Sequence, residues 1–255
     1  MNHKPWQSIF DTYKIHEHDF SKSPFTLTAE QIKKATANFT STTEREVRVL
    51  CKQDTRESRP QVFIDNSLFI LPIKNGIYSI LQGEGYIDIP EITTQADIYK
   101  SKLDFELETS QIGNSKMQHL DFAYASSLVR SFLEDESLVL TIRGRKYTPK
   151  FEFYAGQHKQ LIITESVQTK VDAGYEGRNQ IVLIEAKNSA TKNTIIRQLY
   201  YPFRQWQIHT KKKVNILFFE KRKATYSLWE FSFADPNDYN SIQLLKSATF
   251  EIEPK

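Results

Sequence analysis

The chain has 255 residues, 39% of them hydrophobic and 25% charged, and this length can bury a core in one large domain or in two smaller ones. Cys51 is the single cysteine, which excludes an internal disulfide and a multi-cysteine metal site. No apolar run approaches the ~18 residues of a membrane helix, and the N-terminus has no apolar signal segment, so we expect a cytoplasmic protein without a membrane partner. The net charge of +3 is small, but it is unevenly spread along the chain.

The first part of the sequence predicts short helices followed by a hairpin. Residues 6–13 have helical apolar spacing, and residues 28–31 have the pattern of a capping box that opens a second short helix. Three apolar stretches are predicted strands: residues 62–64, 68–73 and 77–81. Asn75-Gly76 joins the last two as a tight turn. We therefore expect residues 1–108 to form a mixed, winged-helix-like DNA-recognition unit, with the acid-rich stretch 84–108 as its junction with the rest.

Two arginines lie just before Pro60, in a polar segment where basic and acidic residues are interleaved. Arg56 and Arg59 are candidates for reading DNA bases, because arginine binds guanine through two hydrogen bonds in the major groove. A solvated loop with local ion pairs is the alternative interpretation.

The second half of the sequence predicts a sheet covered by helices. Residues 115–134 have the amphipathic spacing of one long helix. Strands are predicted at residues 138–143, 149–154, 160–172, 181–184, 214–219 and 226–233, the last of them at the edge of the sheet. A further helix is expected over residues 191–209, bent or interrupted at Pro202, which lacks a backbone donor. The unalternated runs of Ile, Leu and Val indicate an α/β (α+β) fold, with helices on both faces of a central mixed sheet.

Basic residues are concentrated in two clusters of this second half. Residues 187–223 contain ten Lys or Arg and one acid, Glu220. A second cluster begins at the last residue of the strand predicted at residues 138–143. The candidates for DNA contact from these clusters are Arg143, Arg145, Lys146 and Lys192. A concentrated basic surface suits a polyanion, because neutralised phosphates release counterions, whereas a solvated charged face is the alternative.

Three residues on two neighbouring strands carry the candidate chemistry. Because strand side chains alternate, Glu185 and Lys187 are predicted to share one face while Ala186 points into the apolar layer. Asp172 is expected at the end of the preceding strand, beside Glu185. Two carboxylates suit a hard cation such as Mg²⁺, and an ammonium beside it can orient or deprotonate an attacking water. The alternative is a structural Glu/Lys pair at an exposed strand end.

The Asp172…Glu185-Ala186-Lys187 arrangement resembles the PD-(D/E)XK nuclease superfamily. Four segments are similar to one group of its type II restriction endonucleases: residues 70–78, 171–177, 184–188 and 195–202. This resemblance implies Mg²⁺-dependent hydrolysis of double-stranded DNA at a short specific sequence, giving 5′-phosphate ends, by a homodimer in a bacterial or archaeal host. It also implies a cognate DNA methyltransferase that protects the same site, and a nuclease domain over residues 109–255. The sequence has no Gly-rich phosphate loop, so we expect no nucleotide cofactor.

The resemblance further implies which residues hold the metal. Asp172, Glu185 and Ala186 are the expected metal contacts, and Lys187 is the catalytic lysine beside them. Val171 stands where the motif usually has proline, which leaves Glu176 open as an alternative ligand.

The helix predicted after this motif carries the remaining candidates for DNA contact. Arg197, Tyr201 and Arg204 share one helical stripe that could hold backbone phosphates. Gln198 resembles the polar residue that some relatives place near the metal, although an exposed glutamine is an equal alternative. Two other functions stay open: a structure-specific repair or junction nuclease of the same superfamily, and a non-catalytic DNA-binding regulator.

Overall fold

The computed structural model describes residues 2–187 and 190–253. In its N-terminal part, short helices pack against one face of a small antiparallel sheet. The helices are α1 (His3–Tyr13), α2 (Ala29–Ala35), α3 (Thr42–Arg45), α4 (Val47–Leu50) and α5 (Gln61–Asp65), with 3-10 turns at Ile15–Glu17 and Arg56–Ser58. The strands are β1 (Phe25–Thr28), β2 (Leu68–Lys74) and β3 (Ile77–Gln82), in the order β1-β3-β2.

Local sequence signals explain most of this N-terminal unit. The predicted capping box is present: Thr28 accepts from the Gln31 amide at 3.1 Å, and the Gln31 side chain accepts from the Thr28 amide at 2.8 Å. The strand predicted at residues 62–64 is wrong, because these residues belong to α5. Phe63 of α5 packs edge-on against Trp6, with 4.7 Å between the ring centroids. An apolar run this short fits a buried helix face as well as a strand.

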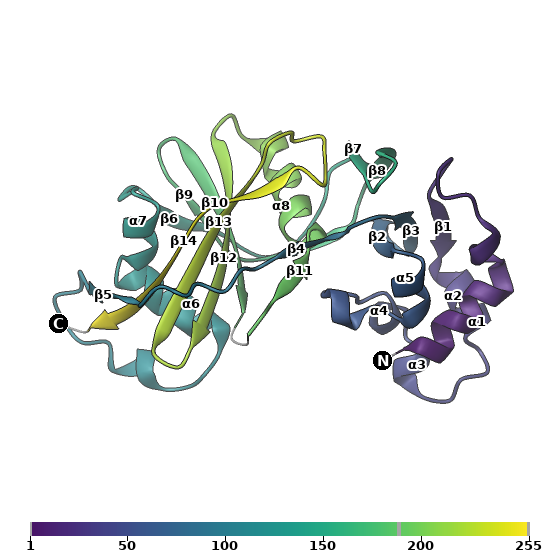
Figure 1. Ribbon diagram of the computed structural model, residues 1–255. Helices are drawn as coiled ribbons and strands as arrows, with labels where there is room; N and C mark the ends of the chain where they lie inside the picture. Colours follow the sequence, from purple (N-terminus) through teal and green to yellow (C-terminus); the bar gives the residue numbers. More distant parts are fainter. Residues whose placement is uncertain (1, 188–189, 254–255) are drawn as a thin grey trace.

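The hairpin of β2 and β3 belongs to two hydrophobic cores at once. Leu68, Ile70 and Ile80 pack in the core of the N-terminal helices. Their alternating neighbours, including Phe69 and Leu81, pack in the core of the C-terminal unit. Figure 1 shows this hairpin between the N-terminal helices and the large sheet. Since successive strand side chains point to opposite faces, one hairpin joins the two units through apolar contact.

The C-terminal unit is built on a seven-stranded mixed sheet with the order β5-β14-β13-β12-β10-β9-β6. Its strands are β5 (Asp97–Lys100), β6 (Val139–Tyr147), β9 (Gln168–Glu176), β10 (Gln180–Lys187), β12 (Lys213–Arg222), β13 (Thr225–Phe233) and β14 (Ile242–Glu253). Two smaller ribbons pair β4 (Tyr86–Asp88) with β11 (Asn193–Ile195), and β7 (Phe151–Ala155) with β8 (Gln160–Thr164). The helices are α6 (Lys116–Ala125), α7 (Leu128–Phe132) and α8 (Arg197–His209), with a 3-10 turn at Glu108–Gln111.

Helices cover both faces of the large sheet, as the unalternated apolar strands predict (Figure 1). On one face, residues of α8 such as Leu199 pack with Leu183 of β10 and Ile216 of β12. On the other face, Leu120 of α6 packs with Ile184 of β10. The expectation of a central mixed sheet flanked by helices is therefore confirmed.

Two elements predicted as continuous are divided by residues with positive φ. The helix predicted at residues 115–134 is two helices, because Ser127 has a φ of 69° between α6 and α7. The strand predicted at residues 160–172 is also two strands, with Ser166 at a φ of 55° between β8 and β9. A left-handed backbone cannot continue a regular helix or strand, and serine gives little sequence signal for it.

Two further predictions differ from the structure: the place of residues 226–233 in the sheet, and the start of the last helix. Residues 226–233 do not form an edge strand, because β13 pairs with both β12 and β14. The helix predicted from residue 191 begins at Arg197, since residues 193–195 pair as β11 with β4, and it is continuous across Pro202.

The acid-rich stretch between the two units contributes to the large sheet. β5 lies before the expected domain boundary at residue 108, yet it pairs with β14 in the sheet of the C-terminal unit. Among residues 2–187 and 190–253, the structure contains no helix with the length and apolar character needed to span a membrane.

Candidate active site

The end of β10 presents two charged side chains on one face of the large sheet. Val182, Ile184 and Ala186 point into the core beneath α6 and α7. The alternating positions therefore face α8, which places Glu185 and Lys187 together on that side, as predicted. Asn188, which ends the motif-bearing segment 184–188, lies outside the described residues.

β9 and β10 part at this point of the sheet. Their antiparallel ladder has its last pair at Ala173 and Ile184. Beyond it, the carboxylate of Asp172 accepts the backbone N–H of Ala186 at 3.0 Å, in place of a backbone carbonyl. Asp172 is 2% exposed and lies within β9, not at its end, because the strand continues to Glu176. Asp172 and Glu185 nevertheless line one cavity of about 310 Å³, so the expected proximity is present.

Lys116, from the first turn of α6, places its ammonium between β9 and β10 where the two strands part. Its ammonium lies 2.5 Å from Oδ2 of Asp172 and 2.9 Å from the carbonyl oxygen of Ala186. The ammonium of Lys170 lies 3.0 Å from the other oxygen of Asp172, Oδ1. Burial raises the pKa of Asp172, but hydrogen bonds, first from Lys116 and then from the Ala186 amide, outweigh burial and hold that pKa below its ordinary value. Asp172 is therefore an ionised carboxylate at neutral pH.

Lys187 is held between a carboxylate and an amide. Its ammonium lies 2.6 Å from Oε1 of Glu185 and 3.3 Å from the side-chain oxygen of Gln198. The same oxygen of Gln198 accepts from the hydroxyl of Thr194 at 3.0 Å. Gln198 is thus a neighbour of the candidate catalytic lysine, and it is half-buried, so the alternative of an exposed helix glutamine does not describe it.

The cavity combines few carboxylates with many cations. Asp172 and Glu185 line it together with four basic side chains: Lys52, Lys116, Lys170 and Arg197. Lys52 comes from the N-terminal unit, so both units contribute to the cavity. An excess of positive charge around two carboxylates suits a phosphate group next to a cation.

The donor set fits a hard divalent cation such as Mg²⁺. The candidate donors are the carboxylates of Asp172 and Glu185 and the backbone carbonyl of Ala186, which are oxygen ligands of the kind that Mg²⁺ prefers. Within the described ranges, no group of three or more His, Cys, Asp or Glu side chains gathers around a common point. Glu176 does not join the site: it pairs with Ile181 at the other end of β9, and its carboxylate binds Lys212 at 2.5 Å.

The helical stripe expected to hold phosphates does not exist as one surface. Tyr201 is 1% exposed, and its hydroxyl donates to the Pro72 carbonyl at 2.9 Å, so this hydroxyl is not free to donate to a DNA phosphate. Arg204 turns toward the segment after β13, where it donates to the side chain of Asn237 at 2.7 Å. Arg197 and Tyr201 both border the cavity, and the Arg197 guanidinium lies 3.6 Å from the carboxylate of Asp54. Because α8 is packed on more than one side, the residues of one helical stripe contact different parts of the protein.

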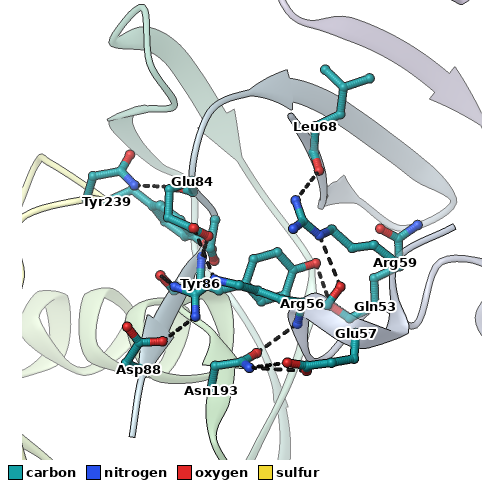
Figure 2. A network of polar contacts seen from close by, with 12 residues as sticks. Gln53, Arg56, Glu57, Arg59, Leu68, Glu84, Tyr86, Asp88, Asn193 and Tyr239 are labelled. Carbon is teal, nitrogen blue, oxygen red and sulfur yellow. Dashed lines mark hydrogen bonds and ion pairs between the residues drawn. The ribbon is translucent and has the colours of Figure 1, made fainter. Parts of the chain in front are cut away.

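Arg56 and Arg59 are both partly buried and contact other groups of the protein (Figure 2). The Arg56 guanidinium binds Glu84 at 3.1 Å, forms an ion pair with Asp88 and donates to the Tyr86 carbonyl at 3.4 Å. Arg59 donates to the carbonyl of Leu68 at 3.2 Å and lies 5.1 Å above the ring of Tyr86. The alternative with local ion pairs describes these arginines in this structure, and their role in reading DNA bases stays a prediction.

The same network joins the N-terminal unit to β11. Asn193 accepts from the Arg56 amide at 2.7 Å and donates to Glu57 at 2.9 Å. The Ile195 amide donates to the Asp54 carbonyl at 2.8 Å. These contacts fix the segment that carries Lys52 against the start of α8.

The remaining basic candidates lie on the sheet edge and in the turn before β11. Arg145 and Lys146 are exposed on edge strand β6, where Arg145 is the register partner of Lys170. Arg143, on the same strand, forms an ion pair with Asp121 of α6. Lys192 is exposed in the turn before β11.

Sequence reasoning missed three lysines of the cavity: Lys52, Lys116 and Lys170. Lys116 lies 56 residues before its partner Asp172, and spacing along the chain gives no sign of that contact. Lys170 carried a usable signal, because residue i−2 on a strand shares the face of residue i.

Comparison with known proteins gives a family for each part of the chain. Residues 3–80 match the family described as Domain of unknown function (DUF6996). No curated protein and no solved structure matches the chain. Residues 81–251, which contain the whole candidate site apart from Lys52, match Domain of unknown function (DUF6997), and because this match covers more than half of the sequence, the chain belongs to that family.

Proposed function

We propose that the protein is a Mg²⁺-dependent endonuclease of the PD-(D/E)XK superfamily that cleaves double-stranded DNA as a type II restriction enzyme. The observation that carries this proposal is the parting of β9 and β10. There the buried Asp172 carboxylate and Glu185 line one cavity, and Lys187 lies on the face of Glu185. The Ala186 carbonyl lies against the Lys116 ammonium, which also binds Asp172. Clustered carboxylates amid cations can hold a metal ion at a phosphate group. In a protein that only binds DNA, the same carboxylates would repel the DNA phosphates.

Asp172, Glu185 and the carbonyl of Ala186 would hold the Mg²⁺ ion, which supplies Lewis-acid polarisation of the scissile phosphate. Lys187 would release its ammonium proton to solvent and, as the neutral amine, orient the attacking water and accept the proton of that water. The Gln198 oxygen, 3.3 Å from the Lys187 ammonium, would keep that side chain directed at the water. Attack on phosphorus forms one P–O bond and breaks the bond to the 3′ oxygen, which takes up a proton from solvent. The products are a 5′-phosphate and a 3′-hydroxyl.

The surroundings of the cavity support binding of the DNA backbone. Lys170 and Arg197 line the cavity, and Arg145 and Lys146 lie on the adjoining sheet edge. We infer that these cations hold phosphates on either side of the scissile bond, while the N-terminal unit serves as a winged-helix-like recognition unit. Cleavage of both strands needs a second catalytic site, so we further propose a homodimer, with a cognate methyltransferase protecting host DNA.

Digestion of a plasmid with Mg²⁺, stopped by EDTA, tests this function. A restriction enzyme gives discrete fragments whose 5′-phosphates allow religation. A smear, or cutting confined to branched DNA, would instead indicate the repair or junction nuclease. Tight DNA binding without cleavage would indicate the non-catalytic regulator and contradict the proposal. Asp172→Asn, purified in the same way, controls for a contaminating nuclease.

A further inference from the structure

Lys116 occupies the position where a cation would meet the candidate site. Its ammonium contacts Oδ2 of Asp172 at 2.5 Å and the carbonyl oxygen of Ala186 at 2.9 Å. These two oxygens belong to the set that, under the proposed function, holds the metal. One positive charge therefore already bridges the two strands at the point where they part.

The buried oxygens require such a charge. The Asp172 side chain is 0% exposed, and an ionised carboxylate in that environment is costly unless a cation and hydrogen bonds compensate it. Lys116 and the Ala186 amide both bind the same oxygen, Oδ2. Lys170 differs from Lys116, because it approaches Oδ1 and its side chain is 55% exposed.

We infer that Lys116 is a positioning residue that holds the metal-binding oxygens in their metal-free arrangement and must leave them when a divalent cation binds. This inference rests on the proposed function. An ammonium and a divalent ion repel each other and cannot share the same two oxygens at contact distance. The Lys116 ammonium can leave these oxygens without movement of α6, because the side chain is 28% exposed and its four-carbon stem is flexible.

The displaced ammonium then has an obvious acceptor. Lys116 lines the same cavity as Lys170 and Arg197, where the DNA phosphate is proposed to lie. A phosphate that binds the displaced ammonium favours the metal-bound form, so DNA and metal would each increase the affinity of the protein for the other. Lys116 would thereby weaken metal binding in the absence of DNA.

Titration with Mn²⁺, followed by loss of the free-ion EPR signal, tests this competition without DNA and without an activity measurement. Lys116→Met should bind Mn²⁺ about tenfold more tightly than the wild type, because the competing charge-assisted hydrogen bonds are gone. Lys170→Met is the matched control: it removes one positive charge near Asp172 but leaves Oδ2 and the Ala186 carbonyl occupied, so its gain should be much smaller. Equal affinities for Lys116→Met and the wild type, or equal gains for both variants, would overturn the inference.

Two additional measurements keep the outcomes distinct. Loss of Mn²⁺ binding in Glu185→Ala assigns the titrated ion to this site; if neither the wild type nor Lys116→Met binds Mn²⁺, the proposed metal site itself is wrong. If Lys116→Met does not fold, the wild type is acetylated with and without Mn²⁺ and modification is read by mass spectrometry. Displacement predicts that acetylation of Lys116 rises when Mn²⁺ binds, and unchanged acetylation with Mn²⁺ bound contradicts it.

Discussion

Replacing Lys187 with methionine removes an ammonium while keeping a side chain of similar length. The wild-type ammonium lies 2.6 Å from Glu185 and 3.3 Å from the Gln198 oxygen, so its position is defined by two acceptors that themselves line the cavity. A positioned proton acceptor contributes about 10²–10⁴ in rate, and we therefore expect cleavage to fall by about 10³-fold. DNA affinity should change little, because the other cations of the cavity remain.

The stability cost of the same substitution should be small. The side chains of Lys187 and Glu185 are 24% and 14% exposed, and a partly exposed pair of this kind contributes about 1 kcal/mol or less to the free energy of unfolding. The melting temperature should then fall by about 2–4 °C. Lys187→Arg should also be impaired, because a guanidinium does not give up its proton and presents a planar fork in place of a compact ammonium.

Lys212→Met is the matched control for this experiment. Lys212 pairs with Glu176 at 2.5 Å, and the two side chains are 33% and 40% exposed, at the end of the sheet away from the site. Single-turnover cleavage rates and melting temperatures are measured for all variants. We expect similar losses of stability but normal cleavage in Lys212→Met. Near-normal cleavage by Lys187→Arg, or equal loss of cleavage in the control, would refute the catalytic role of Lys187.

Three further substitutions test the assignments that the structure changed or sharpened. Arg56→Ala should lower the free energy of unfolding by about 1–2 kcal/mol in urea denaturation, since partly exposed ion pairs are lost, and a change in the DNA fragment pattern would contradict its structural role. Tyr201→Phe should cost about 1 kcal/mol through loss of the buried bond to Pro72, with no change in the salt dependence of DNA binding. Gln198→Leu should slow single-turnover cleavage by about tenfold at unchanged DNA affinity, because Gln198 acts on the reaction only by positioning Lys187. An equal loss of DNA affinity would assign Gln198 to binding.

The sequence alone could predict the central part of the candidate site. Alternation along a buried strand places Glu185 and Lys187 on one face, and the short connection from the preceding strand places Asp172 beside them. These are local rules, which depend on neighbouring residues and need no knowledge of the remaining fold.

The residues that sequence reasoning misassigned depend on contacts between distant segments. Tyr201 and Arg204 share a helical stripe with Arg197, but α8 packs against the sheet and against the β2–β3 hairpin, so Tyr201 is buried against Pro72. Helical periodicity specifies which residues share a face of α8; it does not specify how many faces are covered.

Arg56 illustrates the same limit for charge patterns. Its carboxylate partners, Glu84 and Asp88, lie 28 and 32 residues further along the chain, in the acid-rich stretch. Arg56 and the acid-rich stretch were both visible in the sequence. Their pairing was not predictable, because it requires β4 to lie beside the turn that carries Arg56.

Cleavage of a supercoiled plasmid under single-turnover conditions, with Mg²⁺, by the wild type and by Glu185→Ala tests the proposed nuclease most directly. Circular dichroism first establishes that both proteins are folded, and a gel-shift titration in Ca²⁺ establishes that both bind DNA. We predict Mg²⁺-dependent linear products from the wild type and a rate at least about 10³-fold lower from Glu185→Ala, because one of the metal-holding carboxylates is missing. Cleavage by Glu185→Ala at a tenth of the wild-type rate or more, or a wild type that binds DNA and never cuts it, would contradict the assignment of this site to metal-dependent DNA hydrolysis.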